Sequence, residues 1–203
     1  MKRILLLAAL LALALPTAAF AGSSVDYTNS GGILSGSSSG LTLTGSTLIA
    51  VKGLNGGGLI TGNDLGSVSF QTGTLTSNSN GTLTYAAGGW FKITGNGTNG
   101  IPNGALFTGT FTAPVTLTWE STGVNGTNMY ELTGILSGMT GSGYQTTGVT
   151  VQLVINTGHG VFNGSTYVSS GDTAILVPEP GSLGLLGAGL IGLAGVVRRK
   201  LKA

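Results

Sequence analysis

The sequence predicts an all-β protein, an antiparallel β-sandwich or barrel of about 9–11 short strands. Apolar and polar residues alternate along residues 107–111, 115–119 and 149–155, and a period of two indicates strands with one buried face. No stretch of ten residues in the central part shows helical periodicity. Asn-Gly, which accepts the positive φ angles of tight hairpin turns, occurs seven times, at 55, 80, 96, 99, 103, 125 and 163. A β-solenoid is the alternative, although no fixed repeat is present.

The first segment, residues 1–21, is typical of a secretory signal peptide. Lys2 and Arg3 give it a basic start, and twelve apolar residues without a charge follow. Ala19 and Ala21 then provide the small-x-small pattern that signal peptidase accepts. We therefore expect the export machinery to take up this chain and signal peptidase to cut it after Ala21.

The next segment, residues 22–40, has low complexity and is rich in glycine and serine. This composition predicts a flexible leader, with one candidate strand at Ile33-Leu34. From residue 41 onward, short runs rich in threonine, valine and aromatic residues replace this pattern. We expect the β-domain to span residues 41–176.

The two tryptophans differ in the face of the strand that they occupy. Trp119 shares its face with Leu117, which predicts a core position. Trp90 shares its face with Lys92, while Phe91 lies on the other face, so Trp90 is expected to face solvent. An exposed indole can stack on a sugar ring, which makes Trp90 a candidate glycan contact. The alternative is an edge tryptophan packed under a loop.

The end of the chain, residues 177–203, contains three features of different chemistry in a fixed order. A proline-rich strip is expected to be extended, because each proline fixes φ and disfavours helix in the residue before it. A single hydrophobic, transmembrane helix and a basic tail are expected to follow, with the basic residues remaining cytoplasmic. The strip is Val177-Pro178-Glu179-Pro180, the helix spans residues 183–197, and the tail, residues 198–203, begins with Arg198-Arg199-Lys200.

This order of strip, helix and basic tail resembles the PEP-CTERM sorting signal of Gram-negative bacteria. The resemblance is confined to residues 177–203. It implies export across the inner membrane, transient anchoring by the tail, and recognition by an exosortase, a membrane transpeptidase that would cut near Pro178-Glu179-Pro180. The product would reach the cell surface or the extracellular space. The resemblance implies nothing about the activity of the β-domain.

The charge distribution argues against nucleic acid as a partner. The net charge is +2 and the pI about 9.0, but six of the eight basic residues lie in the two terminal segments. Residues 22–180 hold two lysines against six carboxylates. Cysteine is absent and His159 is the one histidine, so thiol chemistry, disulfides and cysteine-based metal sites are excluded, and we expect no cofactor and no metal.

Three functions are compatible with these features. The first is a non-enzymatic exported protein of the cell surface or extracellular matrix. The second is an extracellular module that binds polysaccharide, such as exopolysaccharide, through Trp90. The third is a glycoside hydrolase that uses Glu120 and Glu131, which flank one predicted hairpin loop. We expect no enzyme, because nothing else in the sequence marks a cleft around these two carboxylates.

Overall fold

The computed structural model describes residues 23–122, 128–156 and 162–177 together with Gly189. Residues Ser24–Val177 form one compact unit that is built from antiparallel strands. In the described part of the chain, the one helical element within this unit is a 3-10 turn, η1. The elements are β1 (Ser23–Ser30), β2 (Ile33–Ser37), β3 (Gly40–Lys52), η1 (Leu54–Gly56), β4 (Leu59–Gln71), β5 (Leu75–Ser79), β6 (Thr82–Tyr85), β7 (Gly88–Asn96), β8 (Asn103–Phe111), β9 (Val115–Thr122), β10 (Asn128–Thr140), β11 (Gln145–Asn156) and β12 (Ser165–Val177).

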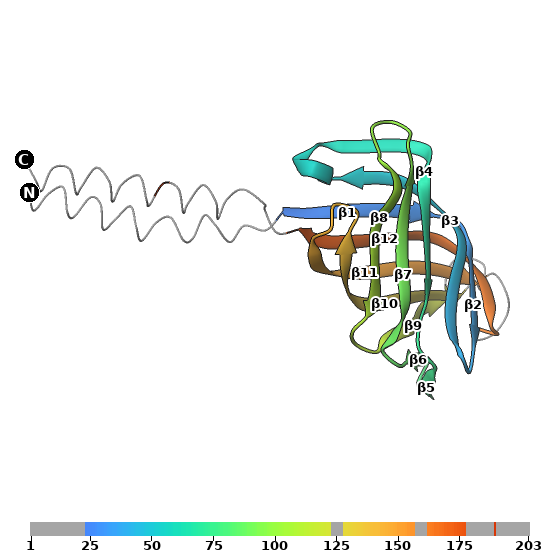
Figure 1. Ribbon diagram of the computed structural model, residues 1–203. Coiled ribbons are helices and arrows are strands. Elements are labelled where there is room, and N and C mark those ends of the chain that lie inside the picture. Colours follow the sequence, from blue (N-terminus) through green and yellow to red (C-terminus); the bar gives the residue numbers. More distant parts are fainter. Residues whose placement is uncertain (1–22, 123–127, 157–161, 178–188, 190–203) are drawn as a thin grey trace, which may run out of the picture. The chain divides into compact units, whose positions relative to one another are not determined.

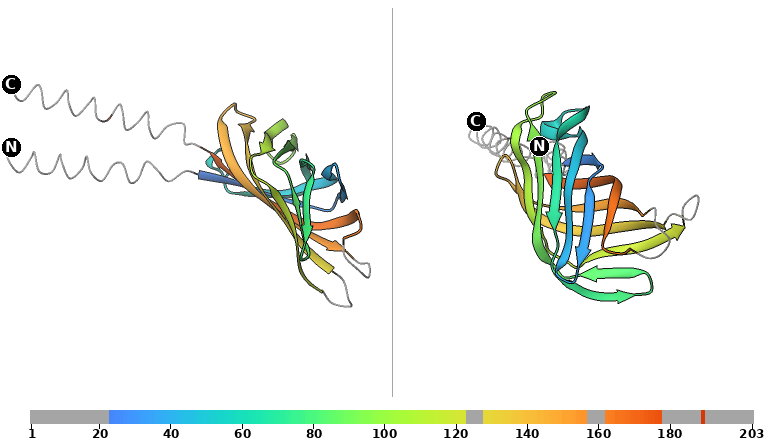
Figure 2. Two further views of the ribbon diagram at one scale, coloured as in Figure 1. Left: turned by 90° about the horizontal axis from the view of Figure 1, so that it is seen from below. Right: turned by 90° about the vertical axis from the view of Figure 1, so that its right-hand side faces the viewer.

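The sheet closes on itself as an eight-stranded antiparallel barrel. Its strands follow the circular order β2, β3, β4, β7, β8, β10, β11 and β12, and β12 pairs back onto β2. In Figure 1, β4, β7 and β8 cross in front of β10, β11 and β12, so the closed sheet has two crossing layers, and Figure 2 shows the same sheet from two further sides. Of the two architectures predicted, the barrel is the one observed, but the described residues form twelve strands rather than the predicted 9–11. The pairings are antiparallel throughout, which excludes a solenoid.

The remaining strands, β1, β5, β6 and β9, add to the barrel by pairing with its strands or with one another. β1 continues the path of β2 along β3, since Ser30 pairs with Thr47 and Ile33 pairs with Thr44 in one register. The β5–β6 hairpin adds to the sheet through β9, which in turn pairs with β10. Hydrogen bonding to β12 on one side and β3 on the other places β1 beside both. The first and last strands of the unit are therefore neighbours.

The segment 22–40, expected to be a flexible leader, instead contains β1 and β2 and the start of β3. Composition misled the prediction, because neighbours on both sides supply backbone hydrogen bonds that a glycine- and serine-rich segment lacks in isolation. The strand at Ile33-Leu34 is present as the start of β2. The β-domain therefore begins well before residue 41.

Asn-Gly pairs form several of the turns. Asn55, Asn80 and Asn99 are the described non-glycine residues with positive φ, at 53°, 51° and 52°, and each precedes a glycine that also has positive φ. Asn80-Gly81 connects β5 to β6, and Asn99-Gly100 lies in the connection from β7 to β8. Two consecutive residues with positive φ define the type I′ turn that favours hairpins. Such turns set the register of the antiparallel sheet.

The apolar core contains a cluster of phenylalanines from three adjacent strands. Phe70 of β4 stacks on Phe91 of β7 with ring centroids 5.7 Å apart, and Phe111 of β8 packs edge-on against both. Phe107 completes the cluster beside Phe91. All four side chains are buried. Offset and edge-to-face contacts of this kind stabilise a core beyond the burial of apolar area alone.

A buried polar network occupies the interior beside β1, β11 and β12. The Asn29 amide donates to Ser46 Oγ at 2.7 Å and to Gln152 Oε1 at 2.9 Å. The Gln152 amide donates back to Asn29 Oδ1 and to Thr150 Oγ1, both at 3.1 Å. The Thr150 hydroxyl lies 2.9 Å from that of Thr173. No buried side-chain nitrogen or oxygen in the described residues lacks a partner.

This network determines which face of β11 points inward. Thr150 and Gln152 are fully buried, whereas Val149 is 42% exposed on the outer surface. Alternation along residues 149–155 predicted one buried face, and the buried face is the polar one at these positions. The inward polar side chains are tolerated because each finds a hydrogen-bond partner.

Gly171 of β12 provides the space for this network. A Cβ at position 171 would overlap the Gln152 amide. We predict that Gly171→Ala lowers the free energy of unfolding by about 2 kcal/mol, as overpacking does. In a Gln152→Ala background the same change should cost much less, because the overlapping group is gone. Urea denaturation of the four proteins in this double-mutant cycle measures the difference.

Gly58→Ala is the matched control for that cycle, because an added Cβ there meets nothing within 4 Å. It should leave the free energy of unfolding nearly unchanged in both backgrounds. An equal cost of Gly171→Ala with and without the Gln152 side chain would contradict the assigned role of Gly171.

Tyr27, on β1, makes stability depend on alkaline pH. The side chain is 2% exposed, and burial raises the pKa of Tyr27 from 10.0 to about 12. The folded protein thus holds the phenol proton more tightly than the unfolded chain. We predict that this contribution is complete below pH 10 and that up to about 3 kcal/mol of stability is lost as the pH rises to 12. Tyr27→Phe should show a shallower loss in denaturation experiments over this range, and parallel curves would contradict the prediction.

Candidate functional site

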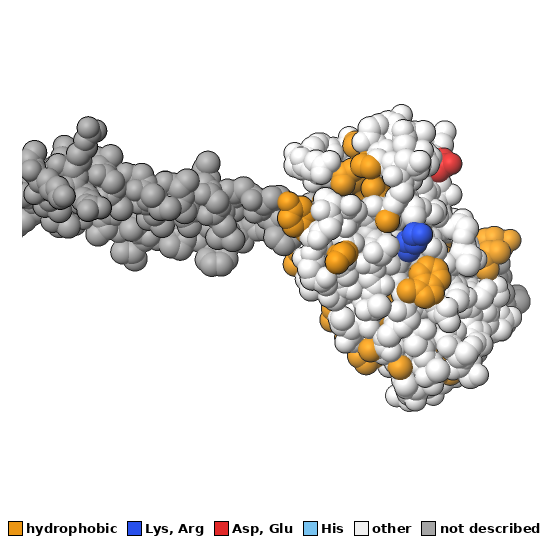
Figure 3. All heavy atoms as spheres, viewed as in Figure 1, with side chains coloured by type: hydrophobic (Ala, Val, Ile, Leu, Met, Phe, Trp, Pro, Cys, Tyr) orange, Lys and Arg blue, Asp and Glu red, His pale blue; other side chains and the backbone are white. Residues whose placement is uncertain are grey.

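The outer surface of the barrel carries few charges and several separate apolar patches. Residues Ser24–Val177 include two lysines and five carboxylates. Figure 3 shows one face of the molecule, on which hydrophobic side chains lie in separate patches on a mostly uncharged surface, with one basic side chain directly beside one of the patches. We argue ligand chemistry for two hollows on this surface and for the exposed side chain of Trp90.

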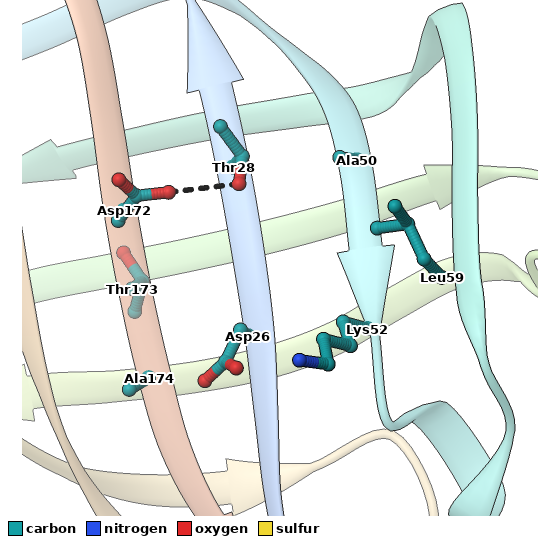
Figure 4. A pocket seen from close by; sticks show the side chains of 8 residues that line it. All are labelled: Asp26, Thr28, Ala50, Lys52, Leu59, Asp172, Thr173 and Ala174. Carbon is teal, nitrogen blue, oxygen red and sulfur yellow. Dashed lines mark hydrogen bonds between the residues drawn. The ribbon is translucent and has the colours of Figure 1, made fainter.

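The first hollow contains three of those seven charged residues and has a volume of about 320 Å³. It lies on the outer face where β1, β3, β4 and β12 are neighbours. Ala50 and Ala174 leave space there because their side chains are short. Figure 4 shows the hollow, which is lined by Asp26, Thr28, Ala50, Lys52, Leu59, Asp172, Thr173 and Ala174.

Strand register brings the charges of this hollow together. Asp26 on β1 pairs directly with Lys52 on β3, and in Figure 4 their charged groups point toward one another. The Thr28 hydroxyl donates to Asp172 Oδ1 at 2.7 Å. The hollow therefore offers two carboxylates and one ammonium group to a ligand that forms hydrogen bonds. No group of three or more metal-ligating side chains occurs among the residues described.

The second hollow surrounds Tyr167 and has a volume of about 460 Å³. Tyr167 on β12 lies between its cross-strand partners Ile33 on β2 and Ile155 on β11. It is 72% exposed, the largest exposed fraction among the large hydrophobic side chains that the structure describes as exposed. Ser165 and Ser169 flank it on the same face of β12, and no residue that lines this hollow is charged.

Trp90 lies on the outer face of β7, in the orientation that its strand parity predicts. Its side chain is 43% exposed, whereas Phe91 is 1% exposed and Ile93 is fully buried. The indole N–H donates to Gln71 Oε1 at 3.3 Å, and Gln71 is the cross-strand partner of Trp90 on β4. This contact holds the indole against the sheet while its ring stays accessible.

The prediction that Trp119 belongs to the core is wrong, because the side chain is 42% exposed. Its cross-strand partner is the buried Tyr130, so Trp119 lies on the inward face as parity indicates. However, it lies toward the end of β9, beside a register irregularity, and its indole N–H donates to Asn128 Oδ1 at 3.0 Å. Parity identified the face, but burial also depends on position along the strand.

Glu120 and Glu131 are not direct partners across the β9–β10 hairpin. Glu131 pairs with Thr118, and its Oε1 accepts a hydrogen bond from the Thr133 hydroxyl at 3.3 Å. Glu120 is exposed at the irregularity in β9. The register therefore does not set the two carboxylates opposite each other. His159, also considered from the sequence, lies outside the described residues.

Sequence reasoning missed both hollows. Asp26 and Asp172 are distant in sequence, so only the closure of the barrel reveals that they share a surface. For Tyr167 a signal was available, because it alternates with Ser165 and Ser169 on a strand whose other face carries Val168. This pattern places a large aromatic ring on a polar face.

Most residues of the predicted sorting signal lie outside the described residues. Val177 is described as the last residue of β12 and packs against the core. Ala19 and Ala21, Pro178-Glu179-Pro180, the basic residues Arg198-Arg199-Lys200 and, except for Gly189, the predicted helix 183–197 are not described. Among the residues that are described, no helix is long and apolar enough to span a membrane.

Comparison with known proteins identifies the C-terminal segment. Residues 176–200 match the family model of the PEP-CTERM protein-sorting motif. This match confirms the resemblance inferred from the tail and implies an exported protein with membrane-associated sorting and an exosortase-type processing partner. No curated protein and no solved structure matches the chain.

Proposed function

We propose that this chain is a non-enzymatic protein of the cell surface or extracellular matrix, which reaches its destination by secretion and C-terminal sorting. Signal peptidase removes residues 1–21, and residues 183–197 anchor the chain transiently in the inner membrane. An exosortase-type membrane transpeptidase then cuts near Pro178-Glu179-Pro180. The β-barrel is the part that remains.

The observation that carries this proposal is the position of the barrel between the two terminal signals. The sorting motif begins at residue 176, and β12 ends at Val177. β1 begins at Ser23, two residues after the predicted signal-peptidase site. A cut at each signal therefore leaves every strand of the barrel intact. The sparse charge of residues Ser24–Val177 also supports a non-enzymatic role, because acid–base chemistry needs positioned ionisable groups.

Processing of the C-terminus can be tested directly. Mass spectrometry of the exported protein, collected from culture supernatant and membranes, should find no peptide from Leu183 onward. A variant with alanine at Pro178, Glu179 and Pro180 should keep residues 183–203 and accumulate in the membrane fraction. An intact C-terminus in the exported wild-type protein would contradict the sorting proposal.

A second candidate function is binding of extracellular polysaccharide, and the exposure of Trp90 favours it. The indole presents an accessible ring on the outer face of the sheet, and Gln71 orients it through the hydrogen bond from the indole N–H. A ring held in this way loses little conformational entropy when a sugar stacks on it.

A pull-down on the exopolysaccharide of the producing strain tests this candidate. Wild-type protein should be retained, and Trp90→Ala should be retained about tenfold less, the loss typical of an aromatic contact at an interface. Trp119→Ala, which removes another exposed indole, is the matched control and should behave like wild type. Equal retention of the wild-type and Trp90→Ala proteins would remove this candidate.

A further inference from the structure

Cross-strand pairing aligns a continuous row of outward-facing polar side chains across five neighbouring strands. The row begins on β12 and ends on β7, and each member is the direct register partner of the next. Its members are Ser165, Ser35, Thr42, Gln71 and Trp90. Four of them are exposed and Thr42 is half-buried. None of them carries a charge.

An accessible aromatic ring lies at each end of this row, which we call the polar row. Trp90 is its last member, and its indole is hydrogen-bonded to Gln71 within the row. At the other end, Tyr167 is two residues from Ser165 on the same face of β12, and the 460 Å³ hollow includes both side chains. The row thus has a ring for stacking at both ends and hydroxyl and amide groups between them.

The length of the row determines the size of the ligand that can use both rings. Neighbouring strands are about 4.8 Å apart, so the four steps from β12 to β7 span about 19 Å along the surface. A single sugar ring cannot reach from one aromatic side chain to the other. An extended chain of several sugar units is needed.

The chemistry of the row selects an uncharged, hydroxyl-rich chain. One face of a pyranose ring exposes C–H groups that pack on an aromatic ring, while its hydroxyls exchange hydrogen bonds with serine, threonine and glutamine. The Tyr167 hollow is uncharged, and its volume lies within the usual range for small-ligand sites. Lys92, two residues from Trp90 on the same face of β7, lies outside the row.

We propose that the polar row, with Tyr167 at one end and Trp90 at the other, is a binding site for an extended neutral polysaccharide. This inference rests on the second candidate function and adds to it a second contact, a direction and a minimum ligand length. The polysaccharide lies across the strands of the sheet rather than along them. It contacts the outer surface, and the interior of the barrel takes no part.

The test uses the full-length protein and defined soluble probes. These are dextran, a β-glucan and a galactomannan as neutral polysaccharides, their disaccharide units, and alginate as an acidic polysaccharide. We expect one neutral polysaccharide to bind, with Trp90→Ala and Tyr167→Ala each weakening its affinity about tenfold. The corresponding disaccharide should bind more weakly and respond to only one of the two substitutions.

Tyr144→Ala is the matched control, because Tyr144 is also exposed, at 40%, but lies outside the row. The side chains of Trp90 and Tyr167 both face outward, so thermal unfolding should be nearly unchanged in the two variants, which separates lost binding from lost folding. If only Trp90→Ala weakens binding, the row is overturned while the second candidate function stands. If no neutral polysaccharide binds, both fail. If the protein prefers alginate and salt abolishes this binding, the proposal is overturned, and the site is an ionic one.

Discussion

The reciprocal amide pair of Asn29 and Gln152 is the constraint on which the interior of the barrel depends. It links β1 to β11 across the intervening β12, which carries Gly171 at this point. Each amide would carry a desolvation cost of about 1–3 kcal/mol if it were buried alone, so removing one leaves the other unsatisfied. Asn29 and Gln152 come from opposite ends of the domain. Their hydrogen bonds therefore specify one register for the strands that close the barrel. The phenylalanine cluster of β4, β7 and β8 fills a different part of the core and contains no polar group.

Sequence periodicity identified the strands better than it identified their faces. The Asn-Gly turns and the alternation around Trp90 were sufficient for the β-class and for the exposure of that indole. Alternation along β11 did not identify the buried face. The side chains that point inward there are polar, because the interior provides hydrogen-bond partners for amides and hydroxyls. Composition failed for residues 22–40, where pairing on both sides, a non-local effect, makes strands from a segment of low complexity. The same limit applies to surfaces, since Asp26, Lys52 and Asp172 share a hollow only because the ring closes.

The sorting segment and the barrel have separable roles. The C-terminal motif occupies residues 176–200, and of its described residues only the first two belong to a strand of the barrel. The barrel contributes a surface with few charges, many hydroxyls and isolated aromatic rings. Such a surface has little long-range electrostatic attraction for charged partners and depends on short-range contacts for selectivity. This combination agrees with the proposed binding of a neutral polysaccharide.

The pairing of the last strand with the first has a consequence for quality control during export. A chain secreted from its N-terminus can close the ring only when β12 has crossed the membrane, because β12 completes the hydrogen bonding of both β11 and β2. A chain interrupted before β12 keeps two open sheet edges, which are prone to pair with other chains. Such a fragment also lacks the motif at residues 176–200. Only a chain long enough to seal its own edges carries the sorting motif, so incomplete and aggregation-prone products do not enter this sorting route.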